Sequence, residues 1–303
     1  AADIIHFPIA VNGQEFSLEK GRIHSYSREL HLKTGELVRR VEWEAPAGER
    51  LKMEFRRIVS MKELHTMAQK ITIVPSDQTV SLKFLPGIDG SVTNSGVQHF
   101  SEGDKRFYDG KFMQSCQTTT QSGIDFVFTQ TCDFSCEGSP YAMGQLIQMD
   151  RRKISCEYTC SLAAGKELVI EKISNVYTSR DKEMEGKTLE QLQQTGLEAL
   201  KRSAAAGYDA LARESAAVWA ERVWDKTPIV IRSQHPMDQL AVRFAQYHLY
   251  VMTPAHDNRM NIGAKGLSGE GYKGHTFWDT DIFALPYFTF TDPDVARSLE
   301  EYR

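Results

Sequence analysis

The sequence lacks the features that mark several large functional classes. Its 36 basic residues do not exceed its 40 acidic ones, and no Lys/Arg-rich run or aromatic platform motif appears, which excludes nucleic acid as an expected partner. No apolar run reaches the ~18 residues of a membrane helix, and the first residues lack the basic flank and apolar core of a signal peptide. The sequence therefore predicts a cytoplasmic protein that does not engage a membrane.

Cysteine is also scarce. The chain has five cysteines, an odd number in a sequence without an export signal, which favours reduced thiols. The pairs Cys132/Cys136 and Cys156/Cys160 have C-x3-C spacing, which leaves a zinc site open as an alternative to small thiols in the core. Core thiols are the favoured interpretation because residues four apart on a strand share one face. We expect neither a metal nor a cofactor.

The first 177 residues alternate apolar and polar side chains in short runs separated by turn residues, which predicts a large antiparallel β-sandwich. Asn12-Gly13 between two apolar runs is a strong hairpin signal. The expected strands are Ile4–Val11, Gln14–Leu18, Arg22–Leu32, Leu37–Glu44, Leu51–Ile58, Ile71–Val74, Val80–Leu85, Phe107–Cys116, Asp125–Cys132, Gln145–Met149, Ile154–Cys160 and Glu167–Tyr177.

The pattern changes to helical steps of three and four after Tyr177. Residues 178–227 are predicted to form a helical linker, broken near Gly207. Asp238 is a candidate N-cap of a further helix, and Asp292 is the candidate N-cap of a last one that has proline at its first position. The expected organisation is thus a sandwich over 1–177, a linker over 178–227 and a third domain that begins at 228 and continues to 303.

The segment 263–281 has the clearest chemical character. Glycines at 263, 266, 269, 271 and 274 precede His275, Phe277, Trp278 and Asp279, which combine an imidazole, an aromatic plate and a carboxylate, and such a group is typical of polyol binding. Three other readings stay open at this point. The aromatic side chains would also suit a core, His275 with Asp279 and Asp281 would suit a divalent metal, and a glycine-rich loop would suit phosphate, although the Gly-Lys-Ser/Thr end of a P-loop is missing.

Several motifs together resemble one enzyme family. They are Gly87-Ile-Asp-Gly90, Gly207-Tyr-Asp-Ala-Leu211, Trp219, Ala241-Val-Arg-Phe244, Asn261-Ile-Gly-Ala-Lys-Gly-Leu267 and Gly269-Glu-Gly-Tyr-Lys-Gly-His-Thr-Phe-Trp-Asp-Thr-Asp281. The chain resembles the inverting disaccharide phosphorylases of glycoside hydrolase family 65, which act on maltose, trehalose, kojibiose, nigerose and glucosylglycerol. It departs from the family pattern at Asp281, where Glu is usual, and at Glu214-Ser215, where Glu-His is common.

The resemblance implies that residues 228–303 begin an (α/α)6 barrel and that Phe277, Trp278, Asp279, Arg259 and His275 bind the substrate. It also implies a reaction in which a glutamate protonates the glycosidic oxygen while inorganic phosphate attacks the anomeric carbon, giving β-glucose 1-phosphate. The expected partners are a disaccharide, phosphate and a second subunit in a homodimer. No catalytic residue is expected in this chain, because in the family the general acid and the phosphate ligands lie in sequence beyond position 303.

The resemblance further suggests that the chain is truncated at both ends and would be inactive by itself. Two alternatives to the phosphorylase remain. One is an inverting α-glucoside hydrolase of trehalase or glucosidase type, because related enzymes share the Phe-Trp-Asp element. The other is a carbohydrate-binding fragment without catalysis.

Overall fold

The computed structural model describes residues 1–266 and 268–303, which divide into two compact units. Unit 1 contains residues 1–31 and 36–215, and unit 2 contains 32–35 and 216–303. Leu267, the last residue of the Asn261–Leu267 motif, lies outside the described residues. The predicted three-part division at residues 177 and 227 stays a prediction.

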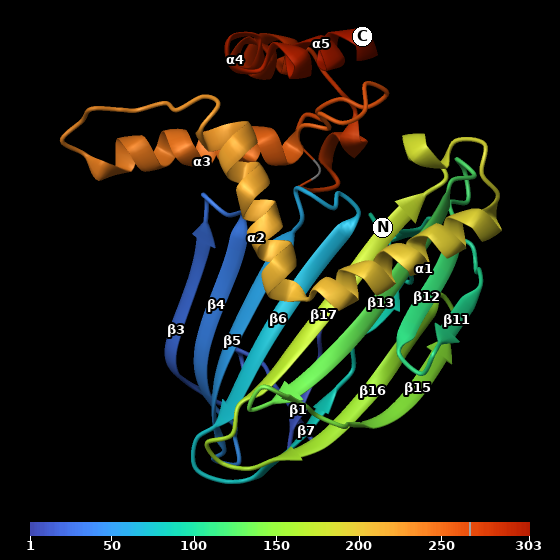
Figure 1. The fold of residues 1–303 in the computed structure, drawn as a ribbon, viewed down its shortest axis with the longest axis vertical. Coiled ribbons are helices and arrows are strands. Elements are labelled where there is room, and N and C mark those ends of the chain that lie inside the picture. Colours follow the sequence, from blue (N-terminus) through green and yellow to red (C-terminus); the bar gives the residue numbers. More distant parts are fainter. Residues whose placement is uncertain (267) are drawn as a thin grey trace. The chain divides into compact units, whose positions relative to one another are not determined.

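Unit 1 is built from two antiparallel sheets (Figure 1). In the described part of the chain, the larger sheet has nine strands in the order β11-β12-β13-β17-β6-β5-β4-β3, with β14 beside β13. The bounds are β3 Arg22–His31, β4 Glu36–Glu44, β5 Arg50–Val59, β6 Thr66–Pro75, β11 Lys105–Tyr108, β12 Phe112–Thr118, β13 Asp125–Cys136, β14 Ser139–Pro140 and β17 Leu168–Thr178.

Among the same residues, the smaller sheet has six strands in the order β15-β16-β7-β1-β2, with β8 beside β16. Its strands are β1 Ile9–Val11, β2 Gln14–Glu15, β7 Val80–Phe84, β8 Gly87–Asp89, β15 Gly144–Asp150 and β16 Lys153–Leu162, and a separate hairpin pairs β9 Thr93–Asn94 with β10 Val97–Gln98. The inner faces of the two sheets share one core, in which Trp43 and Leu51 of the larger sheet join Leu82 and Phe84 of the smaller. The predicted β-sandwich is confirmed.

Two turns, at Asn12-Gly13 and Asp109-Gly110, show where the predicted strands agree with the structure and where they do not. The hairpin at Asn12-Gly13 is confirmed, since both residues have positive φ, at 49° and 81°, as a two-residue hairpin turn requires. The single strand predicted over Phe107–Cys116 is wrong. Asp109 and Gly110 adopt φ values of 54° and 64° and turn the chain, so that β11 and β12 form a hairpin. Asp-Gly is a hairpin signal of the same kind, and it was available in the sequence.

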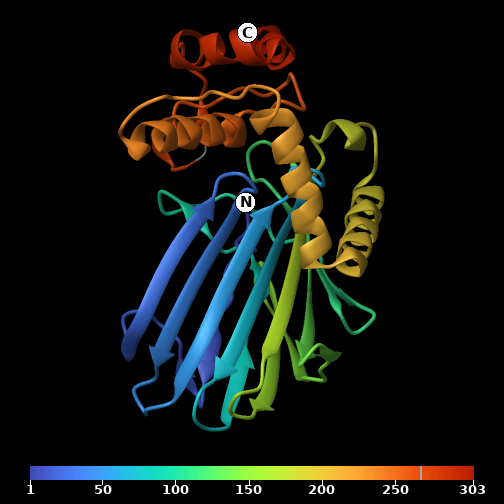
Figure 2. The same ribbon diagram turned by 60° about the vertical axis from the view of Figure 1, so that its left-hand side comes forward.

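Two helices cover the outer face of the nine-stranded sheet (Figures 1 and 2). Helix α1 (Leu189–Ala206) begins with a capping box between Thr188 and Gln191, follows a short 3-10 helix at Lys182–Met184, and ends at Gly207. Helix α2 (Tyr208–Trp219) follows directly and continues as a π-helical turn, Ala220–Trp224. The φ of Gly207 is 76°, which favours glycine and explains the predicted break.

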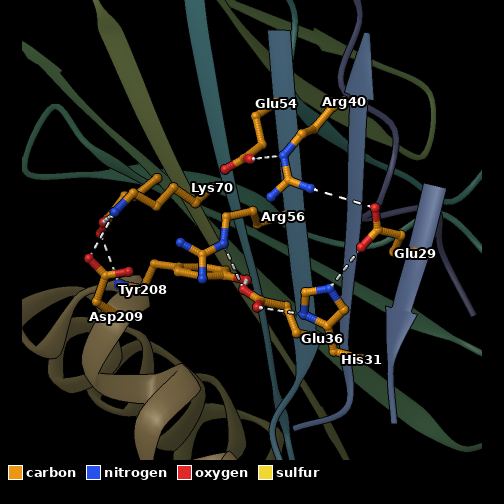
Figure 3. Close-up of polar contacts among 10 residues, drawn as sticks. Glu29, His31, Glu36, Arg40, Glu54, Arg56, Lys70, Tyr208 and Asp209 are labelled. Carbon is orange, nitrogen blue, oxygen red and sulfur yellow. Dashed lines mark hydrogen bonds and ion pairs between the residues drawn. The ribbon is translucent and has the colours of Figure 1, made fainter. Parts of the chain in front are cut away.

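Tyr208, the first residue of α2, anchors this helix to the sheet (Figure 3). Its buried hydroxyl donates to Oε1 of Glu36 at 2.7 Å, and Nε of Arg56 donates to the same oxygen at 2.8 Å. Next to it, Lys70 donates to Asp209 at 2.8 Å. Burial alone would raise the pKa of Glu36, but the bonds from Arg56 and Tyr208 outweigh it and lower the pKa. The Gly207–Leu211 motif therefore has a structural role at this contact.

Replacing Tyr208 by phenylalanine is expected to destabilise unit 1 by about 1–2 kcal/mol, because the buried carboxylate of Glu36 loses one of its donors. Since the folded-state pKa of Glu36 is lowered, the stabilisation is present at neutral pH and is lost as the pH falls through that value. Urea unfolding at neutral and at acidic pH measures both effects. Tyr26→Phe, at an exposed position, is the matched control, and an equal loss in both variants would contradict the assignment.

Unit 2 contains α3 (Pro236–Met252), a π-helical turn (Thr280–Ala284) that runs into α4 (Leu285–Thr291), and α5 (Pro293–Tyr302). Its buried aromatic contacts include Trp219 against Tyr247, with ring centroids 4.7 Å apart. The predicted start of α3 at Asp238 is wrong, because Pro236 occupies the first turn and His235 is the N-cap. Asp292 is the N-cap of α5 as predicted, but its side chain pairs with Lys226 at 2.8 Å instead of bonding to the helix.

The five cysteines are free thiols in unit 1. Cys116, Cys132 and Cys156 are buried, and burial raises the pKa of Cys132 to about 12, so the core-thiol prediction is confirmed for these three. Within residues 1–266 and 268–303, no helix combines the length and the apolar character needed to cross a lipid bilayer.

Candidate functional site

The glycine-rich segment forms a loop in unit 2 that is closed on itself. The backbone N–H of Ala264 donates to the carbonyl of His275 at 3.2 Å, which joins the two sides of the loop. At the base, the buried hydroxyl of Thr280 donates to the carbonyl of Ile262 at 3.0 Å. These contacts fix where the chain leaves the loop, and so they fix the position of the Phe-Trp-Asp element just before Thr280.

Glycine is required at only part of this loop. A Cβ on Gly263 would lie 3.1 Å from the carbonyl oxygen of Gly274, so the two sides meet where both lack side chains. Gly266 and Gly274 have positive φ, but so do Tyr272 and Lys273, at 58° and 53°. Each non-glycine residue in this region costs roughly 1–2 kcal/mol. Non-glycine residues with positive φ also occur at turns of unit 1, such as Asn12 and Asp109, so this strain alone does not mark a functional site.

Trp278 presents an open aromatic face. Its side chain is 71% exposed, and Phe277, at 38%, packs edge-to-face against Tyr272 with ring centroids 5.3 Å apart. Exposure does not separate a core role from a ligand-binding role here, because Phe283 and Phe290 of the same unit are 76% and 87% exposed, more than Trp278. The indole face of Trp278 has the chemistry to stack on the apolar face of a sugar ring.

The polar candidates lie at the same end of the loop. His275 and Asp279 are exposed, and Asp279 precedes the π-helical turn directly after Trp278. Asp281, by contrast, is engaged, because it accepts a hydrogen bond from the Arg303 guanidinium at 2.6 Å. In the part of the chain that the structure describes, no three His, Cys, Asp or Glu side chains are grouped as metal ligands.

Arg259 is held in place by a neighbouring carboxylate. Its Nε and terminal nitrogen both donate to Asp257, at distances down to 2.7 Å, and the Asp257 side chain is almost fully buried. Hydrogen bonds from Arg259 lower the pKa of Asp257 to about 2. The arginine is thus fixed before any ligand arrives, on the segment between α3 and the glycine-rich loop.

The arrangement suits recognition of a neutral polyol better than chemistry on it. An exposed indole at 278 can stack on a ring, and an exposed carboxylate at 279 can accept hydrogen bonds from ring hydroxyls. The five residues expected to bind substrate all belong to this loop or to the segment before it. Their role as ligands stays a prediction.

A second group of charged residues lies in unit 1 and was not expected from the sequence. Arg28, Arg39 and Arg57, on three adjacent strands, line a cavity of about 270 Å³. The signal was present, because Arg39 is two residues before Val41 and four before Trp43, and therefore shares a strand face with two core side chains.

Comparison with known proteins agrees with the architecture of both units. Residues 1–222 match the model of the glycosyl hydrolase family 65 N-terminal domain, and residues 243–303 match the family 65 central catalytic domain. The chain belongs to glycosyl hydrolase family 65.

Among curated relatives, the kojibiose phosphorylase of Halothermothrix orenii is 43% identical over 99% of this chain, and the kojibiose phosphorylase of Escherichia coli is 36% identical over 99%. An α,α-trehalose phosphorylase of Thermoanaerobacter brockii is 29% identical over the whole chain. The chain spans 39%, 38% and 39% of the lengths of these three proteins. It therefore corresponds to less than two fifths of each.

One solved structure, described as a kojibiose phosphorylase from the human microbiome, superposes on the full chain with a TM-score of 0.88 at 21% identity, and 38% of that structure is covered. This similarity confirms the fold of a β-sandwich followed by a helical segment and the first helices of the (α/α) barrel.

Proposed function

We propose that the whole protein catalyses inverting phosphorolysis of an α-glucosyl disaccharide, giving β-glucose 1-phosphate and an acceptor sugar. The observation that carries the proposal is the similarity along almost the entire chain to relatives named as kojibiose, trehalose and nigerose phosphorylases. The loop before α4 supports the proposal, because it carries an aromatic and a carboxylate side chain, Trp278 and Asp279, at consecutive exposed positions.

The residues of this chain would supply binding. Trp278 would stack on the glucosyl ring, Asp279 would accept hydrogen bonds from its hydroxyls, and Phe277, His275 and Arg259 would complete the contacts. The general acid, a glutamate, and the phosphate ligands would come from the part of the whole protein that follows residue 303. Inverting transfer needs one protonated carboxyl and room for a nucleophile on the opposite face, and phosphate brings its own charge to that face.

The proposal also covers the co-substrate, the cofactor requirement, the location and the subunit number of the whole protein. Inorganic phosphate would be the co-substrate and no cofactor would be needed. The whole protein would act in the cytoplasm as a homodimer. Light scattering coupled to size-exclusion chromatography measures the subunit number directly.

The test is the cleavage of disaccharides by the whole protein with and without phosphate. Kojibiose is the first substrate to try, followed by nigerose, trehalose and maltose. Cleavage that depends on phosphate and yields a sugar phosphate supports the proposal. Equal release of free glucose without phosphate would instead identify the hydrolase alternative. Binding without cleavage under either condition would identify a carbohydrate-binding protein.

Replacing Trp278 by alanine is expected to raise KM for the disaccharide about tenfold to a hundredfold, because the glucosyl ring loses the aromatic face it stacks on, a contact of roughly 1.5–3 kcal/mol. Trp278→Phe retains a smaller ring and should restore part of the affinity. Steady-state kinetics of the whole protein measures both variants. An unchanged KM in Trp278→Ala would remove this residue from the binding site.

A further inference from the structure

The cavity beneath β3, β4 and β5 concentrates positive charge on an apolar face of unit 1. Arg28 and Arg39 are directly opposite each other in the β3–β4 register, and Arg57 on β5 is paired with Leu37, which precedes Arg39 by two residues on the same face of β4. Like charges directly opposite each other on a sheet repel. Such an arrangement is costly unless an anion compensates it.

The described residues do not provide that anion. Among them, no carboxylate forms an ion pair with Arg28, Arg39 or Arg57, although many other arginines and lysines of unit 1 have such partners. Burial lowers the pKa of both Arg39 and Arg57, and the charges of neighbouring arginines add to it, while Tyr26 acts in the opposite direction on Arg39. Arg39 and Arg57 are half-buried and Arg28 is exposed, so the cost of desolvated positive charge falls on Arg39 and Arg57.

Two polar atoms at the cavity are buried without a hydrogen-bond partner in the described part of the chain. They are Nε of Arg39, a donor, and Oε1 of Gln69, an acceptor. The Arg39 guanidinium lies over the ring of Phe55, 4.1 Å from its centroid, which orients the group but leaves Nε unsatisfied. Buried polar groups are rarely left unpaired, so both atoms require a partner within the cavity, which is either water or a ligand.

The rest of the cavity defines the occupant further. Its walls include the apolar side chains of Ile5, Phe7, Leu37 and Ile71, and its volume of about 270 Å³ exceeds what a single small inorganic ion needs. We propose that this arginine cavity binds a carboxylate that carries an apolar part and a hydrogen-bond donor. The guanidinium groups would hold the carboxylate, the donor would satisfy Gln69, and the apolar part would contact the walls.

Two sources of this chemistry are possible: a free small organic acid, or an acidic side chain from another part of the whole protein, with a backbone N–H as the donor. The inference does not depend on the proposed function, because the cavity belongs to unit 1 and the candidate sugar site belongs to unit 2.

Thermal unfolding of the whole protein tests the proposal through the direction in which the Tm changes. The variants are Arg39→Gln and Arg57→Gln, the matched control is Arg22→Gln at an exposed position of β3, and the probes are 2-hydroxybutyrate, its neutral amide and inorganic phosphate. For a free acid, we expect 2-hydroxybutyrate to raise the Tm of the wild type and the control, and to bind at least tenfold more weakly to the cavity variants. The amide should have no effect.

For an acidic side chain of the protein itself, we expect no shift with the probe, and a Tm that falls in the cavity variants but not in the control. Removing Arg57 from an empty cavity would relieve repulsion, whereas removing Arg39 would also lose its contact with the ring of Phe55, so a fall in Tm counts for the proposal only when Arg57→Gln shows it. A Tm that is unchanged or higher in Arg57→Gln, with no response to 2-hydroxybutyrate, would therefore overturn the proposal. A response to phosphate that equals the response to 2-hydroxybutyrate, and that is lost in Arg39→Gln, would overturn it as well, because it would identify a site for inorganic anions.

Discussion

Replacing Asp279 by asparagine is expected to lower kcat/KM for phosphorolysis about a hundredfold to a thousandfold. Asp279 follows Trp278 in the sequence and is exposed, and its carboxylate can accept two hydrogen bonds from sugar hydroxyls. Hydrogen bonds to a charged group contribute about 1.5–3 kcal/mol each, and every 1.4 kcal/mol corresponds to about tenfold. Asparagine keeps the shape but loses the charge and one acceptor, so most of that contribution disappears.

The matched control for Asp279→Asn is Asp294→Asn, another exposed carboxylate near a helix start in unit 2. The control should retain the wild-type kcat/KM within about twofold. If Asp279→Asn also retains it while both variants keep the wild-type fold by circular dichroism, Asp279 does not contact the reacting sugar. The binding role assigned to the loop would then be wrong at its main polar residue.

Replacing Lys172 by methionine is expected to stabilise the 303-residue chain by about 1–3 kcal/mol at neutral pH. The Lys172 side chain is fully buried in unit 1 and donates to the carbonyl of His6 at 2.9 Å. Burial lowers the pKa of Lys172 from 10.5 to about 8, with Cys132 and Asp3 acting in the opposite direction. A lowered pKa means that the charged form is held in the fold at a cost, which methionine removes.

The pH dependence of this effect has a definite sign. Between about pH 8 and 10.5 the unfolded chain binds more protons than the folded chain at Lys172, so the wild type gains stability as the pH rises through this window. Below pH 8 the full cost is present. Urea unfolding of wild type and Lys172→Met across this range should therefore show a difference that shrinks as the pH rises. Lys52→Met, at an exposed position on β5, should show no such trend. A constant difference, or a less stable Lys172→Met at neutral pH, would contradict the account.

The fold was largely predictable because local signals and tertiary packing agree in unit 1. Alternating side chains located most of the long strands, and Gly207 located the break between α1 and α2. The wrong predictions came from turn and helix-start signals of one or two residues that the side-chain pattern overrode in the prediction. Asp109-Gly110 turned a predicted strand into a hairpin, and Pro236 started α3 before the expected cap at Asp238. The pairing order of the strands was not predictable, since it depends on contacts between residues far apart in the sequence.

The candidate site was predictable in part for a different reason. The loop stands out in the sequence by its many glycines. The candidate residues could therefore be selected without coordinates; they are His275, Phe277, Trp278 and Asp279. The exposure of Trp278 and the pairing of Arg259 with Asp257 could not. The arginine cavity was missed because each arginine looks ordinary within its own strand. It becomes unusual only when adjacent strands bring three of them to one face.

The most direct test of the proposed function follows the reaction of kojibiose and phosphate with the whole protein by proton NMR from the first minutes. We predict equal amounts of β-glucose 1-phosphate and glucose, with the β anomer of the phosphate ester formed first and no product when phosphate is left out. Glucose without any sugar phosphate, or α-glucose 1-phosphate as the initial product, would contradict inverting phosphorolysis.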